Sequence, residues 1–247
     1  MSGHSKWSTI KHKKGALDAK RGKIFTKLIK EITIAARIGG PDIEMNPRLR
    51  LAVQNAKGKN MPKDTIERAI KKVAGGDAAD YQEPTYEGYA TNGVAVFVEC
   101  TTDNLNRTVA MVRSIFTKHG GSLGTNGSLE FIFDRKGVFS LPAPSNDLDE
   151  LSLEFIDAGA EDVEVEDGFI TVTCAMEDFG TMQQKFEDLG LEPENAELER
   201  IPNTYVSLDD DAFRKVMKLI EALEDDDDVQ KVYHNIEATD AQLAELT

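Results

Sequence analysis

The stretch Val94–Val98 (VAVFV) is where the hydrophobic pattern of this 247-residue chain changes. Five consecutive apolar residues, three of them valines, predict a buried strand. Upstream of this stretch the apolar residues recur every three or four positions, which is the helical period. Downstream, short apolar runs typical of strands alternate with further helical segments. The sequence therefore predicts an α+β fold that begins with a helical region.

The first predicted helix covers residues 23–38. It carries an apolar stripe at helical spacing, and its lysines Lys23, Lys27 and Lys30 are expected to lie outside that stripe. Gly39–Pro41 should end the helix, because glycine weakens a helix and proline cannot continue one.

Two shorter helices are predicted next. Asn46 suits an N-cap and Pro47 suits the first helical position, while Gly58 closes this second helix. A third begins near Pro62. Since such helices can bury their stripes only against one another or a neighbour, residues 1–77 are predicted to form a basic three-helix domain.

The short link between the second and third helices also allows a helix-turn-helix that reads duplex DNA. The alternative is that the basic outer face of these helices is only exposed to solvent.

The remainder of the chain predicts two further domains. Residues 134–202 give the order βαββαβ, a complete ferredoxin-like unit. The flanking segments 94–133 and 204–236 each give only βαβ, and neither has enough faces to enclose a core. We therefore expect one split α/β domain, residues 78–133 and 203–240, with the ferredoxin-like domain inserted into it.

Local residue chemistry predicts several connections within this part. Residues 77–87 are polar and acidic and indicate a linker, and Leu129–Phe133 alternates in the manner of a strand. Asp103 and Asp209 are placed to cap helices. The acidic run Asp225–Asp228 is expected to be a solvated turn.

Charge is distributed very unevenly along the chain. The net charge is −15, yet residues 1–72 contain 18 basic and 6 acidic side chains, a net charge of +12. The remaining residues contain 11 basic and 38 acidic side chains, a net charge of −27. Such a division favours a nucleic-acid-binding head joined to an acidic body.

The most basic part is the segment Gly3–Lys14 (GHSKWSTIKHKK). Lysines separated by small polar residues suit a polyanion, and Trp7 could stack on an unpaired base. The alternative is that Trp7 packs against its own domain and that the rest of this segment, the N-terminal arm, is a mobile stretch exposed to solvent. The candidate nucleic-acid-binding residues are Lys6, Trp7, Lys11, His12, Lys13, Lys14, Lys20, Arg21, Lys23, Lys27, Lys30, Arg48 and Arg50.

A series of ordered motifs runs along nearly the whole chain. They are Gly3–Trp7, Asp18–Lys23, Phe25–Lys30, Asn46–Arg50, Asn60–Asp64, Tyr86–Tyr89, Thr102–Asn104, Asn106–Thr108, Gly120–Gly124, Leu223–Gln230 and Val232–Asn235. Together they resemble the YebC family, which includes bacterial regulators and the mitochondrial translational activator of cytochrome c oxidase. The resemblance implies a three-domain protein acting in gene expression. Bacterial members are commonly assigned as DNA-binding transcriptional regulators; the other possibility is a ribosome-associated factor that binds ribosomal RNA and relieves stalled translation.

The sequence has no recognisable catalytic constellation. Its four histidines lack the spacing of metal ligands, and no serine lies in a nucleophile-elbow motif. Gly120–Gly127 follows a helix and leads into a strand, whereas phosphate-binding loops run from strand to helix. Adjacent carboxylates at Asp225–Asp228 lack the alternating spacing of a calcium loop. No enzymatic activity, metal, cofactor or small-molecule substrate is expected, and the polar cluster Asp103–Thr108 is either a helix cap or a contact site.

The compartment is predicted from cysteine usage and hydropathy. Cys100 and Cys174 lie far apart in apolar runs, which indicates buried thiols in a reducing compartment. No stretch approaches the ~20 apolar residues of a membrane span, and the lysine-rich start lacks the apolar segment of a secretory signal. A cytoplasmic protein with no membrane partner is expected.

Taken together, the residues favour a non-enzymatic, nucleic-acid-binding regulator of gene expression. Its partner would be DNA, ribosomal RNA or the ribosome itself. A protein-interaction scaffold, in which the acidic domains dock basic partners, is the less favoured alternative.

Overall fold

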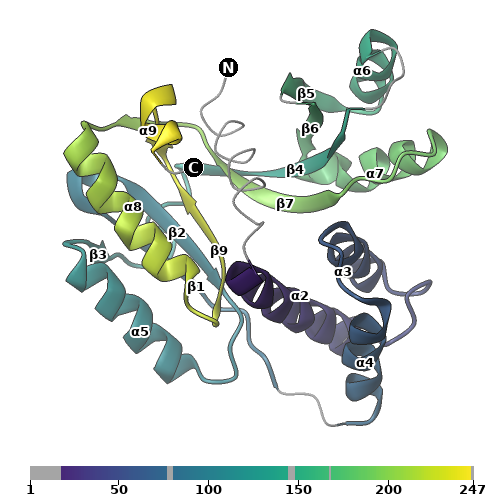
Figure 1. Ribbon diagram of the computed structural model, residues 1–247, viewed down its shortest axis with the longest axis horizontal. Helices are drawn as coiled ribbons and strands as arrows, with labels where there is room; N and C mark the ends of the chain where they lie inside the picture. The colour runs from purple at the N-terminus through teal and green to yellow at the C-terminus, as the bar shows by residue number, and fades with distance from the viewer. Residues whose placement is uncertain (1–17, 77–79, 144–147, 167, 246–247) are drawn as a thin grey trace. The chain divides into compact units, whose positions relative to one another are not determined.

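The computed structural model describes residues 18–76, 80–143, 148–166 and 168–245, and it confirms the predicted α+β class (Figure 1). The described residues fall into two compact units. Of the described residues, unit 1 draws on 18–30, 80–134 and 201–245, and unit 2 on 31–76, 135–143, 148–166 and 168–200. Three elements pass from one unit into the other: helix α2 (Asp18–Gly39) and strands β4 (Phe133–Pro142) and β7 (Asn195–Pro202).

Unit 1 is built on a four-stranded antiparallel sheet with the order β3-β1-β2-β9. Its strands are β1 (Thr85–Tyr89), β2 (Ala95–Cys100), β3 (Ser122–Leu123) and β9 (Val229–His234). Strand β9 therefore comes from the far end of the chain and pairs directly with β2, for instance at Val98 and Val232. A short parallel pair, β8 (Val206–Ser207) and β10 (Ile236–Glu237), and the closing helix α9 (Asp240–Ala244) complete this part.

Helices α5 (Leu105–Lys118) and α8 (Asp210–Glu224) cover one face of this sheet. Both are amphipathic, and their apolar stripes meet the valines of β2. The core on this face includes Val96, Val98, Val112, Phe116, Phe213, Val216, Leu219 and Ile220. The predicted cap of α8 is confirmed, because the Asp209 side chain accepts a hydrogen bond from the Ala212 N–H. The prediction for α5 is wrong by one residue, since Asn104 rather than Asp103 accepts the Arg107 N–H.

The second face of the sheet is covered by a segment that was predicted to be a strand. Residues 126–132 form turns, and Phe133 begins β4. Leu129 and Phe133 are buried in a cluster with Phe97 and Tyr233, whereas Phe131 is exposed. Apolar residues do alternate here, but the buried Glu87 carboxylate accepts backbone N–H groups that a strand would need for pairing with its neighbour. It bonds to the N–H of Gly127 at 2.7 Å and of Leu129 at 2.6 Å.

The predicted linker at 77–87 is also partly wrong, because its end is strand β1. The reason lies in close packing against the glycine-rich segment after α5. A side chain at Gly88 would clash with the Ser122 carbonyl oxygen and the Phe116 ring, and one at Gly121 would approach the Tyr89 carbonyl oxygen to 2.7 Å. The polar composition of this segment did not indicate a strand, but Gly88 lets the backbone of β1 approach that of Ser122 closely. A one-turn 3-10 helix, Thr91–Gly93, links β1 to β2.

Unit 2 contains the second half of α2 with helices α3 (Pro47–Gly58) and α4 (Lys63–Ala74). The predicted cap is confirmed: Asn46 accepts the Leu49 N–H at 3.1 Å, and its amide also donates to the carbonyl oxygens of Ala35 and Gly40. One side chain thus joins the end of α2 to the start of α3. The apolar faces of the three helices are buried, including Ile32, Ala36, Leu49, Val53, Ala56 and Ile66.

The rest of unit 2 has the predicted order βαββαβ. It consists of β4, α6 (Leu148–Asp157), β5 (Ala160–Glu166), β6 (Phe169–Ala175), the 3-10 turn Met176–Asp178, α7 (Phe179–Asp188) and β7, and the sheet order is β5-β6-β4-β7. Helices α6 and α7 share a core with β4 and β6, in which the Phe139 ring stacks on Phe179 and Phe186. The two cysteines are buried free thiols, and burial raises the pKa of Cys100 to about 12 and that of Cys174 to about 11.

Helix α3 packs directly on the start of β7. The Asn55 side chain accepts the Ala196 N–H at 3.0 Å and donates to the Ala196 carbonyl oxygen at 2.9 Å, so it pairs with that backbone as a neighbouring strand would. Gly58 lies against the Glu194 carbonyl oxygen, which leaves no room for a side chain. This contact places the later helices of the N-terminal region in the same compact unit as the βαββαβ segment.

We predict that Gly58→Ala destabilises the protein by about 1–3 kcal/mol, because the added methyl group would overlap the Glu194 carbonyl oxygen. Gly180→Ala is the matched control, since Gly180 lies in α7 with nothing within 4 Å of its potential side chain. That change should leave stability equal or raise it by up to ~1 kcal/mol. Denaturant unfolding of the two variants measures the difference, and equal stabilities would refute the close contact.

Candidate functional site around the start of helix α2

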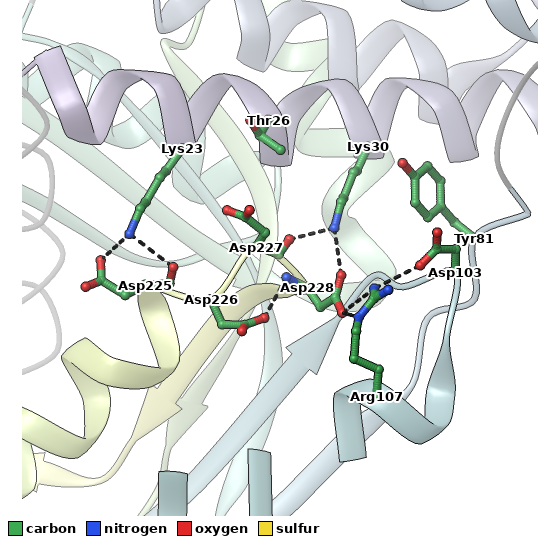
Figure 2. Close-up of a pocket in the computed structure, with 10 residues that line it drawn as sticks. All are labelled: Lys23, Thr26, Lys30, Tyr81, Asp103, Arg107, Asp225, Asp226, Asp227 and Asp228. Carbon is green, nitrogen blue, oxygen red and sulfur yellow. Dashed lines mark hydrogen bonds and ion pairs between the residues drawn. The ribbon is translucent and has the colours of Figure 1, made fainter. Parts of the chain in front are cut away.

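A pocket of about 650 Å³ opens in unit 1 beside the first half of α2 (Figure 2). Its walls come from α2, from the segment that leads into α5, and from the turn between α8 and β9. The residues that line it are Lys23, Thr26, Lys30, Tyr81, Asp103, Arg107, Asp225, Asp226, Asp227 and Asp228. It is therefore a pocket of mixed charge, walled by a basic helix face on one side and an acidic turn on the other.

Asp228 is the centre of the hydrogen-bond network at this site. Only 7 % of the residue is exposed, and its Oδ2 accepts from Arg107 Nη2 at 2.7 Å, Thr108 Oγ1 at 2.9 Å and Thr102 Oγ1 at 3.1 Å. Its Oδ1 accepts from Lys30 Nζ at 3.1 Å. A buried carboxylate is costly to desolvate unless it is paired and hydrogen-bonded, and here both oxygens are satisfied.

Lys30 is likewise buried, with 9 % of the residue exposed. Besides Asp228, its ammonium group donates to the carbonyl oxygens of Asp227 at 2.6 Å and Thr101 at 3.1 Å, and it lies 5.6 Å from the centre of the Tyr81 ring. Helical periodicity predicted that this lysine lies outside the apolar stripe. The prediction did not foresee that Lys30 is buried, because the helical period of α2 gives no information about the Asp228 carboxylate, which lies far away in the sequence.

Two further lysines of α2 contact the end of α8. Lys23 Nζ donates to the Asp225 carboxylate at 2.8 Å and to the Asp225 carbonyl oxygen at 3.1 Å, and Lys27 Nζ donates to the Glu224 carbonyl oxygen at 2.9 Å. The last turn of α8 contains no basic residue of its own. Since the C-terminal end of a helix carries partial negative charge and unsatisfied carbonyl groups, these lysines supply the missing cations.

The electrostatics follow from this arrangement. Burial is the largest influence on the pKa of Asp228 and acts to raise it, but hydrogen bonds from Arg107, Lys30 and Thr108 outweigh burial and hold that pKa below its usual value. Burial, together with the charges of Asp103 and Asp228, raises the pKa of Tyr81. The Asp228 carboxylate is therefore ionised at neutral pH, and it pairs with Lys30 and Arg107.

This geometry holds charged groups from three separate elements together. Asp228 is engaged on both oxygens, and within the described ranges no group of three or more His, Cys, Asp or Glu side chains could hold a metal ion. The prediction that Asp225–Asp228 is a solvated turn is wrong for Asp228, which is buried, although Asp225 is exposed over 73 % of its side chain. The polar cluster Asp103–Thr108 caps α5 through Asn104 and also supplies Arg107 and Thr108 to Asp228.

The predicted nucleic-acid-binding residues separate into three groups. Lys6, Trp7, Lys11, His12, Lys13 and Lys14 lie outside the described residues. Lys23, Lys27 and Lys30 are brought together at the site, and α2 also carries Lys20 and Arg21, whose guanidinium lies 5.5 Å from the centre of the Phe25 ring. Arg48 and Arg50 belong to unit 2, where Arg48 pairs with Glu31 at 3.1 Å and Arg50 donates to the Glu44 carbonyl oxygen at 2.6 Å.

Sequence reasoning did not assign Tyr81, Thr102 and Asp228 to the site, and it weighed Arg107 only within the cluster Asp103–Thr108, as a helix cap or a contact site. For Thr102, Arg107 and Asp228 the signal was present in the ordered motifs Thr102–Asn104, Asn106–Thr108 and Leu223–Gln230, whereas Tyr81 lies in none of them. These motifs are far apart in the chain, yet they meet around one carboxylate.

The comparisons with known proteins define the class. Residues 5–76 match the family model described as the TACO1/YebC protein N-terminal domain, and residues 81–236 match the model of the TACO1/YebC second and third domain. A "Probable transcriptional regulatory protein" of Amoebophilus asiaticus is 59% identical over 96% of this chain and 98% of its own length. Another of the same name, from Geotalea uraniireducens, is 54% identical over 100% of both chains.

A solved structure agrees with these sequence matches. The crystal structure of a conserved hypothetical protein from Aquifex aeolicus is 46% identical, with a TM-score of 0.81, and covers 90% of this chain and 93% of its own. The chain belongs to the TACO1/YebC family, and its relatives from Amoebophilus asiaticus and Geotalea uraniireducens are named probable transcriptional regulatory proteins. In the part of the chain that the structure describes, no helix has the length and apolar character needed to cross a membrane.

The Asp228 network predicts a specific pH dependence of stability. A carboxylate whose pKa is lower in the folded state contributes stability above its unfolded pKa of about 3.9, and this stability is lost as the pH falls through the folded value. Asp228→Asn should therefore cost about 2–3 kcal/mol at pH 7 and progressively less below about pH 4.

The control is Asp211→Asn, which removes one exposed carboxylate from the start of α8 and should change stability by less than about 0.5 kcal/mol. Urea unfolding of both variants and the parent between pH 3 and pH 7 makes the comparison. A destabilisation by Asp228→Asn that stays constant across this range would contradict the ionised, paired carboxylate.

Proposed function

We propose that the protein is a non-enzymatic, nucleic-acid-binding regulator of gene expression and that its basic N-terminal region makes the contact. The observation that carries this proposal is the charge division, +12 over residues 1–72 against −27 over the rest of the chain. Counterion release from phosphates gives a basic segment affinity for any nucleic acid, whereas an acidic segment repels one. The regulatory names of the relatives support the same class.

The basic residues of the described helices support this location. Helix α4 carries Lys63, Arg68, Lys71 and Lys72, all exposed to solvent. Lys63 and Lys71 share the Glu67 carboxylate as an ion-pair partner, so the helix retains a net positive charge. Exposed lysines on a helix surface bind phosphates as point charges and carry little sequence information.

Charge alone does not separate DNA from RNA, but Trp7 favours a second candidate within the same class. An indole in a lysine-rich arm suits stacking on an unpaired base, which folded RNA offers and duplex DNA does not. This observation supports a ribosome-associated translation factor that binds ribosomal RNA. We expect either function to be carried out in the cytoplasm. We also propose that the protein has three domains, formed by residues 1–77, by residues 78–133 with 203–240, and by residues 134–202.

The proposal predicts that neutralising three arm lysines weakens binding to every nucleic acid. Changing Lys11, Lys13 and Lys14 together to Ala should flatten the log–log salt dependence of affinity by roughly 2 to 3 units if each lysine contacts one phosphate. Affinity measured against salt, on a ribosomal RNA fragment and on duplex DNA, gives this slope.

The matched control changes Lys118, Lys215 and Lys218, which are exposed on helices of the acidic part, to Ala. The same three charges are lost, and the slope should stay unchanged. Equal weakening by the two triple variants would refute a basic head as the binding region. It would instead favour a general charge effect or a protein-interaction scaffold.

The two candidates are separated by Trp7→Ala. If Trp7 stacks on an unpaired base, its loss should cost about 1–3 kcal/mol on RNA with single-stranded loops and almost nothing on duplex DNA. The salt slope should be unaltered, because the indole carries no charge. Equal losses on both nucleic acids, together with a lower melting temperature, would show that Trp7 packs on its own domain.

A further inference from the structure

Three lysines of helix α2 are already held by oxygen atoms of their own protein. Lys23, Lys27 and Lys30 all donate to the segment that ends α8 and leads into β9. Figure 2 shows the contacts of Lys23 and Lys30. The acceptors are the carboxylates of Asp225 and Asp228 and the carbonyl oxygens of Glu224, Asp225 and Asp227. We name Glu224–Asp228 the acidic turn.

The acidic turn offers these lysines the same chemistry as a nucleic-acid backbone. Both present several negatively charged or strongly polar oxygens within a short segment, and Lys recognises such oxygens as a point charge. The negative end of α8 adds to this field. A phosphate that approaches Lys23 or Lys27 therefore competes with oxygens of the acidic turn for the same ammonium group.

The contacts differ in how readily they can be displaced. The Lys23 and Asp225 side chains are 43% and 73% exposed, and an exposed ion pair of this kind is weak and screened by salt. The Lys30 and Asp228 side chains are only 11% and 10% exposed, and Arg107 also bonds to Asp228. The outer pair can exchange partners while the inner pair keeps the helix in place.

We propose that the acidic turn is an internal competitor of nucleic acid: it occupies Lys23 and Lys27 in the free protein and yields them to phosphates on binding, while Lys30 remains anchored to Asp228. This inference rests on the proposed function, because it assigns regulation to the same basic region. It gives the protein a built-in reduction of affinity for non-specific polyanions, since each phosphate contact at this place replaces an existing one.

Neutralising Asp225 tests the competition. Asp225→Asn in the full-length protein should tighten binding of a single-stranded RNA oligonucleotide and of duplex DNA by about two- to fivefold at physiological salt, the size expected for one exposed ion pair. The substitution keeps the backbone groups that close α8, so the melting temperature should be nearly unchanged.

Asp211→Asn is the control. It removes the same charge from the first turn of the same helix, about 21 Å away along a 1.5 Å rise per residue, which is more than two Debye lengths at physiological salt. Its effect on affinity should be negligible. Equal tightening by Asp225→Asn and Asp211→Asn would mean that only net charge matters, and would overturn the proposal.

A double-mutant cycle identifies the lysine that is released. Lys23→Ala should weaken binding of both probes, and the gain from Asp225→Asn should disappear in the Lys23→Ala background, because no competition for that ammonium remains. A gain that persists without Lys23 would overturn the inference.

The failures of the two proposals are distinguishable. If the parent protein binds both probes and Asp225→Asn changes nothing, the internal competition is wrong and the nucleic-acid function stands. If neither the parent nor Asp225→Asn binds either probe, both proposals are wrong.

Discussion

A carboxylate removed from water must be matched by cations and hydrogen-bond donors, and much of unit 1 is arranged to satisfy this requirement at Asp228. Lys30 comes from α2 and Arg107 and Thr108 from α5, while Asp228 itself precedes β9. Lys30 and Asp228 are 198 positions apart in the chain. Two charges that would be expensive to bury alone thereby hold the first half of α2 beside a sheet whose strands come from residues 85–123 and 229–234.

The parts of the fold that depend on local chemistry were readable from the sequence. Asn46 and Pro47 identified the start of α3, Asp209 identified the start of α8, and the change from helical to strand period gave the βαββαβ order. The errors arose where a distant partner decides the conformation. Leu129–Phe133 alternates like a strand, yet the Glu87 carboxylate accepts the Leu129 N–H. Strand β1 was missed because its composition is polar, and it packs closely because Gly88 has no side chain.

The site was only half visible for the same reason. Lysines clustered near the start of the chain point to a phosphate-binding region, and this needs no knowledge of tertiary structure. Nothing in a run of four aspartates indicates which one is buried. That choice depends on Lys30, on Arg107 and on the hydroxyl groups of Thr102 and Thr108, all of which donate to the Asp228 carboxylate. The same lysines therefore serve as structural partners in the free protein and as candidate phosphate ligands.

The central claim, that Asp228 is an ionised buried carboxylate paired with Lys30 and Arg107, is tested most directly by carbon-13 NMR titration of its carboxyl group, assigned by comparison with Asp228→Asn. The account predicts a titration midpoint below the value of about 3.9 for a solvated aspartate, moving upward in a Lys30→Met variant. A midpoint at or above about 3.9 in the parent protein, unmoved by that substitution, would contradict it.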